Sequence, residues 1–65
     1  MRLYAITALG DRIRKDRSGD SEVLRVLDYL YENKTASQDQ LEVGGADIFT
    51  LKSMARHGLI QELTQ

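Results

Sequence analysis

One stretch of strong helical periodicity, over about residues 22–33, most constrains what this chain can fold into. Its apolar residues follow the spacing i, i+3, i+4, i+7 that places them on one face of a helix: Val23, Val26, Leu27, Leu30 and Tyr31. Leu24 widens this face, so we expect the helix to lie at the centre of the fold. Asp20 or Ser21 can cap its start, and Asn33 can adopt the left-handed conformation that ends it.

The chain is too short to build more than one core around this helix. Its 65 residues predict a single domain, 1–65, and a chain of this length buries only about 60% of its unfolded surface. It has no cysteine and one histidine, His57, which exclude a disulfide scaffold and disfavour a zinc site, so no cofactor is expected. No apolar run is long enough for a membrane helix or a signal peptide. With Met1 at its start and 29% charged residues, we expect a whole, small, soluble cytoplasmic protein.

Short elements are expected before the central helix. The segment 3–7 is rich in strand-forming residues, and Thr7 can then cap a short helix over about residues 8–17. Leu9 and Ile13, four residues apart, are its predicted buried stripe. The basic residues of this helix would then face water.

Two further helices and a strand are expected after it. Ser37, with Gln40 three residues later, predicts a capping box for a helix over about 38–43 that turns Leu41 inward, and Gly44-Gly45 ends that helix. Asp47 can cap a helix over about 48–57 that turns one side to the core, with the residues Ile48, Leu51 and Met54.

The end of that last helix predicts how the chain finishes. Gly58 and Leu59 fit a Schellman motif in which Leu59 packs back on Met54, and His57 in the last turn suits a capping role. Residues 60–64 are expected to form a terminal strand. The strands at the two chain ends have no other predicted partner, so we expect them to pair with each other, within one chain or between two. The expected fold class is mainly α with a small β-sheet (α+β).

Residues 22–64 resemble a winged helix-turn-helix domain of the kind common in small archaeal and bacterial regulators. A long first helix (residues 23–30) precedes a short capped helix, a glycine-containing turn, and a third helix that ends in Leu-Lys-Ser-Met-Ala-Arg-His-Gly-Leu-Ile (residues 51–60). Residues 3–10, Leu-Tyr-Ala-Ile-Thr-Ala-Leu-Gly, resemble the stretch that usually follows the wing, but here that stretch comes first and no residues remain for a wing hairpin. The resemblance implies a winged-helix-like fold with a three-helix core, an N-terminal strand and a short helix.

The resemblance also implies that the third helix enters the major groove of double-stranded DNA. The DNA contacts would be its exposed residues: Phe49, Thr50, Lys52, Ser53 and Arg56. Arg56 suits a bidentate contact to guanine, and Lys52 suits a phosphate. Phe49 either contacts a thymine methyl or joins the core beside Ile48. The alternative for Lys52 and Arg56 is an ordinary solvated helix face.

Charge is unevenly distributed along the chain, whose net charge is −1. Residues 1–17 carry five basic and two acidic groups, whereas residues 18–47 carry two basic and seven acidic groups. The N-terminal cations that could clamp DNA phosphates beside the third helix are Arg12, Arg14, Lys15 and Arg17. Alternatively, these cations pair with the acidic middle of the chain, including Asp28, Glu32 and Asp39.

The leading functional hypothesis is therefore a small DNA-binding transcriptional regulator that acts as a homodimer. The alternative is a winged-helix module that binds a protein partner and no DNA, which the acidic middle favours. RNA binding by the basic N-terminal segment is a third hypothesis, disfavoured because aromatic stacking residues are few. No nucleophile–base pair or metal constellation indicates an enzyme, and Gly44-Gly45 lacks the lysine of a phosphate-binding loop. Of Tyr29 and Tyr31, one is expected to pack inward and the other to mark a partner surface.

Overall fold

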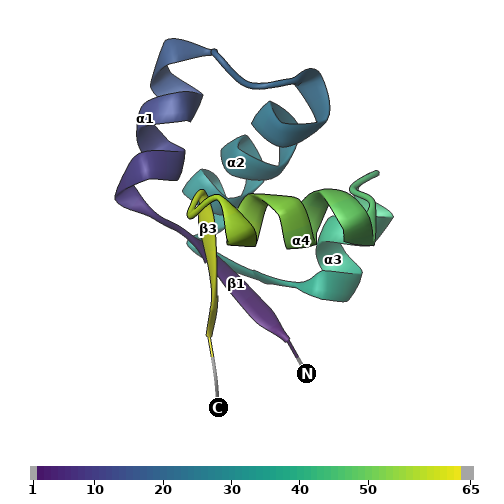
Figure 1. Ribbon diagram of the computed structural model, residues 1–65. Helices are drawn as coiled ribbons and strands as arrows, with labels where there is room; N and C mark the ends of the chain where they lie inside the picture. Colours follow the sequence, from purple (N-terminus) through teal and green to yellow (C-terminus); the bar gives the residue numbers. More distant parts are fainter. Residues whose placement is uncertain (1, 64–65) are drawn as a thin grey trace.

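A computed structural model describes residues 2–63, which form four helices and three strands (Figure 1). In chain order the elements are β1 (Leu3–Ile6), α1 (Ala8–Asp16), α2 (Ser21–Asn33), β2 (Thr35–Ser37), α3 (Gln38–Val43), α4 (Ile48–Arg56) and β3 (Ile60–Leu63). The predicted α+β class, mainly helical with a small sheet, is confirmed. The helix boundaries agree with the sequence-based ranges to within one residue, while Thr64, the predicted end of the last strand, lies outside the described residues.

The sheet has the strand order β2-β1-β3, and both pairings are antiparallel. The expected pairing of the two terminal strands is confirmed within one chain, with Tyr4 opposite Glu62. On its other side Tyr4 lies opposite Ala36 of β2, a strand that the sequence analysis missed. This strand is only three residues long, too short for alternation of apolar and polar residues to reveal it.

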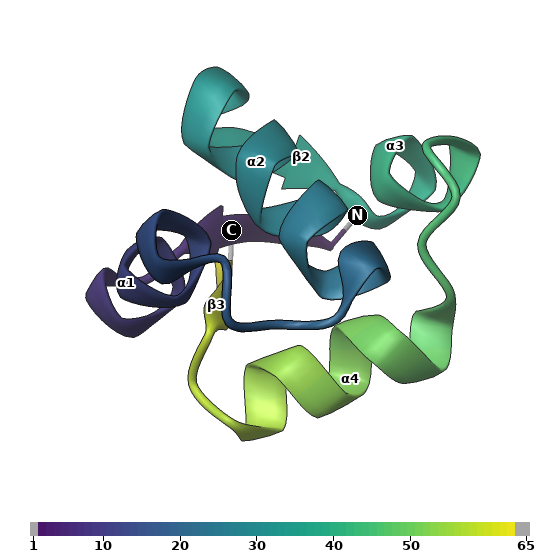
Figure 2. The same ribbon diagram turned by 90° about the horizontal axis from the view of Figure 1, so that it is seen from above.

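The core lies between the sheet and the helices. Helix α2 packs against β1 and β2, and α4 contacts both α2 and β3, while α1 packs on α2 on the side away from α3 (Figure 2). The buried apolar residues come from six of the seven elements and from the loop before α4: Tyr4, Val26, Leu27, Leu30, Ala36, Leu41, Ala46, Leu51, Met54 and Ile60. The central position predicted for the helix over residues 22–33 is confirmed.

The predicted helix ends are largely confirmed. The Thr7 side chain accepts a hydrogen bond from the Gly10 N–H, and Ser37 and Gln40 form the complete capping box. At the end of α4, Gly58 adopts a φ of 80°, which a residue with a side chain rarely does. The Leu59 N–H bonds to the Met54 carbonyl, and the Gly58 N–H bonds to the Ala55 carbonyl, which together are the Schellman motif.

The orientation predicted for α1 is wrong. Leu9, expected in the core, is 45% exposed, and the buried residue is its neighbour Gly10. The backbone of α1 approaches the loop after α4 so closely that a Cβ on Gly10 would lie 2.1 Å from the Leu59 carbonyl oxygen. Only glycine fits this contact, and the contact rotates Leu9 toward solvent. Ile13, the second predicted residue, is partly buried as expected.

Two predictions for α2 are also wrong. Tyr31, placed on the apolar stripe, is 54% exposed, and Tyr29 is 38% exposed, so neither tyrosine packs inward. The Arg14 guanidinium lies 3.6 Å from the centre of the Tyr31 ring, so Arg14 is partly covered instead of facing water freely. Asn33 is the last helical residue, and its side chain donates to the Tyr29 carbonyl oxygen; the residue with positive φ is the C-cap Lys34, at 68°.

We expect Gly10→Ala to lower the free energy of unfolding by about 1–3 kcal/mol, because the new Cβ forces α1 away from Leu59. Gly44→Ala is the matched control: Gly44 has a φ of −75°, and its Cβ would meet no atom closer than 3.5 Å. Urea unfolding followed by circular dichroism measures both. Equal stability of the two variants would contradict the close approach.

Candidate nucleic-acid interface

Helix α4 lies at the surface and turns a polar face outward. Leu51 and Met54 are buried in the core, which leaves Lys52, Ser53 and Arg56 exposed. Phe49 is 74% exposed, so the core alternative for this residue is excluded. Four of the five residues predicted on this helix are thus available to a large partner.

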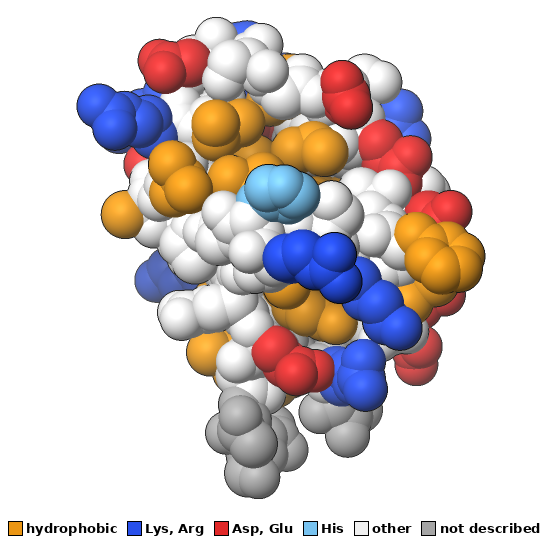
Figure 3. Space-filling view, in the orientation of Figure 1, with side chains coloured by type: hydrophobic (Ala, Val, Ile, Leu, Met, Phe, Trp, Pro, Cys, Tyr) orange, Lys and Arg blue, Asp and Glu red, His pale blue; other side chains and the backbone are white. Residues whose placement is uncertain are grey.

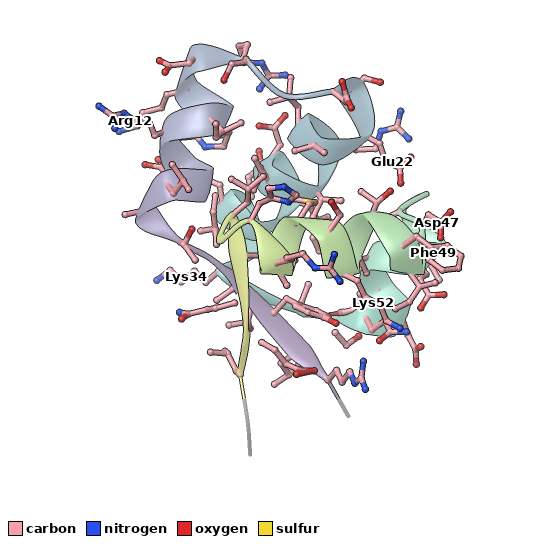
Figure 4. The ribbon with its side chains drawn as sticks, in the orientation of Figure 1. Arg12, Glu22, Lys34, Asp47, Phe49 and Lys52 are labelled. Atoms are coloured by element: carbon pink, nitrogen blue, oxygen red, sulfur yellow. The ribbon has the colours of Figure 1, made fainter. Side chains whose placement is uncertain are left out.

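The fifth predicted residue, Thr50, is only partly exposed and turns toward α2. Glu22, in the first turn of α2, accepts a hydrogen bond from the Asp47 backbone N–H at 3.0 Å (Figure 4). This backbone hydrogen bond, followed by the Thr50 side chain, holds the pKa of Glu22 below its ordinary value of 4.5. Glu22 therefore links the start of α4 to the first turn of α2, and Thr50 is part of this link.

The exposed face of α4 is basic. Residues 48–56 include Lys52 and Arg56 and no carboxylate. Neither cation makes an ion pair within residues 2–63. Figure 3 shows basic side chains forming a band across this face, next to the single histidine.

Arg2 adds to this basic face, and the sequence analysis missed it. It shares a surface hollow with Lys52, and its Nε lies 3.3 Å from Glu62 on β3. The pairing of β1 with β2 brings Arg2 there, since the Arg2 carbonyl oxygen accepts the Gln38 N–H at 3.0 Å and Gln38 lines the same hollow. Because β2 was not predicted, the sequence carried no signal for this position of Arg2.

His57 ends α4 as predicted. It is the C-cap residue, and its Nδ1 lies 2.8 Å from the Ser53 carbonyl oxygen. Because a carbonyl oxygen only accepts, Nδ1 carries the proton and donates to it. The exposed imidazole is thereby held against the last turn of α4.

The predicted N-terminal cluster of cations is mostly engaged with carboxylates. Arg14 and Lys15 both pair with Asp11, at 2.8 Å and 3.4 Å. Arg17 pairs with Asp28 at 3.0 Å, the one pairing with the acidic middle of the chain that the structure contains within residues 2–63. Arg12 makes no ion pair in this range and points away from the molecule at the far side from Lys52 (Figure 4). The cluster and the α4 face do not form one continuous surface.

Two other kinds of feature, a metal-binding cluster and a membrane-spanning helix, are absent from the described residues. Residues 2–63 contain no group of three or more histidine, cysteine, aspartate or glutamate side chains that could hold a metal ion. None of the helices in this range is both long and apolar enough to cross a membrane. Comparisons with protein-family models, with curated proteins and with solved structures find no match.

We expect Glu22→Gln to destabilise the protein at neutral pH, because a neutral amide is a weaker acceptor for the Asp47 N–H. The lowered pKa of Glu22 means that its carboxylate stabilises the fold above about pH 4.5 and that this stabilisation is lost as the pH falls through the lowered pKa. The wild type and the variant should therefore converge in stability at low pH. Urea midpoints measured between neutral and acidic pH test this.

Glu32→Gln is the control for this comparison. Glu32 lies on the same helix, is exposed, and makes no ion pair within the described residues, so its loss should change stability little at any pH. If Glu22→Gln were as stable as the wild type at neutral pH, the conclusion that Glu22 stabilises the fold by linking α2 to the start of α4 would be wrong.

Proposed function

We propose that this protein binds double-stranded DNA through the exposed face of α4 and acts as a small cytoplasmic transcriptional regulator. The observation that carries the proposal is the composition of this helix: two cations that make no ion pair within residues 2–63, and no acidic residue between positions 48 and 56. DNA presents closely spaced phosphates, so a helix approaches it at low cost only where its outer face is free of carboxylates. The winged helix-turn-helix resemblance of residues 22–64 supports the same helix.

The side chains on this face suit different parts of a major groove, which is wide enough to admit an α-helix. In this proposal Arg56 reads a guanine edge, and Lys52 neutralises a phosphate. Ser53 can hydrogen-bond to phosphate or base, and exposed Phe49 can contact a thymine methyl. Arg2 shares a hollow with Lys52 and would join as a further phosphate contact by exchanging the exposed Glu62 carboxylate for a phosphate.

The N-terminal cations have a smaller part in this proposal. Arg12 is free to meet a phosphate, but it lies far from Lys52 and would need DNA that extends around the molecule. Arg14, Lys15 and Arg17 would have to exchange a carboxylate for a phosphate. The carboxylate contacts of Lys15 and Arg17 are exposed and stabilise the fold by about 0–1 kcal/mol each, so such an exchange costs little.

The small size of the interface favours two copies on DNA. A single domain of this kind buries roughly 600–1,000 Å² of its surface on DNA, which supports modest affinity. A homodimer on two half-sites would double the contacts and add sequence information. We therefore propose that regulation, where it needs tight binding, uses a homodimer.

We expect binding to a mixed-sequence duplex to weaken steeply with added salt. Two phosphate-neutralising cations, Lys52 and Arg2, predict a slope of log affinity against log salt of about −1.8. The double variant Lys52→Gln with Arg56→Gln should weaken binding and reduce the steepness by about 0.9, because the guanine contact and one of the two phosphate contacts are lost. Fluorescence anisotropy of a labelled duplex at several salt concentrations measures these slopes.

Arg12→Gln is the matched control, since it removes one exposed cation without touching α4. It should leave the slope nearly unchanged. If Arg12→Gln changed the slope as much as the α4 double variant does, the DNA interface would lie at the N-terminal cluster and not at α4. No binding by the wild type even at low salt would refute the proposal and favour the alternative, a domain that binds a protein partner and no DNA.

A further inference from the structure

A hollow between α2 and α3 is separate from the basic face of α4. It has a volume of about 220 Å³, and α3 and the loop that follows it run alongside one flank of α2 there (Figure 2). Its floor consists of side chains that also belong to the core: Val26, Leu41 and Ala46. Because these residues are fixed by the core, the hollow is preformed.

The rim of this hollow is acidic. Three carboxylates, Glu22, Asp28 and Glu32, stand against one guanidinium, Arg25. Glu32 makes no ion pair within residues 2–63, and Asp28 is engaged only by the exposed Arg17. An apolar floor inside a rim of net negative charge is complementary to a ligand that has an apolar anchor and flanking cations.

The size of the hollow selects among such ligands. Small-molecule sites usually enclose about 300–1,000 Å³, so this hollow is too small for most of them. It is large enough for one apolar side chain that projects from a peptide. An exposed aromatic side chain supports a peptide-sized contact: Tyr29 forms part of the wall and is 38% exposed.

We propose that the hollow between α2 and α3 is a docking site for a basic amphipathic segment of another protein. One apolar side chain of the segment enters the hollow between Tyr29 and Leu41, and lysine or arginine side chains flank it and pair with Glu32 and Asp28. DNA is excluded from this surface by the same carboxylates that attract the segment. The site is independent of DNA binding by α4, and either surface can exist without the other.

The probe is a synthetic helical peptide of about 15 residues that contains only leucine and lysine, with the leucines along one face. Backbone amide shifts of the full chain are followed by NMR during the titration. The expected shifts lie on α2 and α3 around the hollow, at residues 25–32 and 40–46. The same peptide with glutamate in place of lysine should not bind.

Two variant pairs locate the contact. Tyr29→Ala removes a wall of the hollow and should weaken binding about tenfold, whereas Tyr31→Ala, on the same helix but outside the hollow, should leave it unchanged. Glu32→Gln should weaken binding about two- to fivefold, whereas Asp39→Asn removes an exposed carboxylate outside the hollow and should have no effect.

Several results would overturn the proposal. Equal binding of the lysine and glutamate peptides, or shifts outside the hollow, would show that the rim does not select a cationic segment. Concentration-dependent shifts at the hollow without any peptide would assign it to a second copy of this chain. Shifts at the hollow on addition of a DNA duplex would assign it to nucleic acid. Lys52 and Arg56 lie outside the hollow, so the outcome of the peptide titration does not depend on whether α4 binds DNA.

Discussion

The corner between β1 and α1 fixes the geometry on which the basic face depends. The Thr7 backbone N–H donates to the Leu59 carbonyl oxygen at 3.2 Å, and the single O–H of the Thr7 side chain donates a hydrogen bond shared between the carbonyl oxygens of Gly58 and Leu59. The same hydroxyl accepts the Gly10 N–H that begins α1. One side chain therefore joins the first turn of α1 to the turn that ends α4. Since Glu22 links the opposite end of α4 to α2, α4 is held at both ends against the rest of the fold.

Local signals explain why most of the helical architecture could be predicted from the sequence. A cap such as Ser37 with Gln40, or a stop such as Gly58 with Leu59, involves residues only a few positions apart, so its pattern is visible in the chain. The rotation of α1 was not visible, because it depends on the contact of Gly10 with Leu59, nearly fifty positions away. A glycine in a helix reads as weak propensity in the sequence, whereas here it marks a close approach of two backbones.

The difference between local signals and contacts that are distant in the sequence also applies to the candidate interface. The exposure of Lys52, Ser53 and Arg56 follows from the spacing of Leu51 and Met54 along one helix, so the sequence identified them. The engagement of Arg17 by Asp28 and the placement of Arg2 beside Lys52 depend on how separate elements pack. The sequence analysis treated the N-terminal cations as one cluster, and this overstated how many cations lie on a single surface. Three of the four N-terminal cations are paired, and the fourth lies away from α4.

Charge separation gives the domain two surfaces that would reject each other's ligands. Helix α4 carries two cations and no carboxylate, and the α2–α3 hollow carries an excess of carboxylates around an apolar floor. Glu22 lies at their boundary, since it lines the hollow and also accepts the Asp47 N–H that begins α4. A change at Glu22 therefore affects both surfaces, so its effect on binding cannot be assigned to either one. Glu32 lines only the α2–α3 hollow, and Lys52 lies only on the α4 side. A change at Glu32 therefore affects only a partner that binds the acidic rim, and a change at Lys52 affects only a partner that binds the basic face.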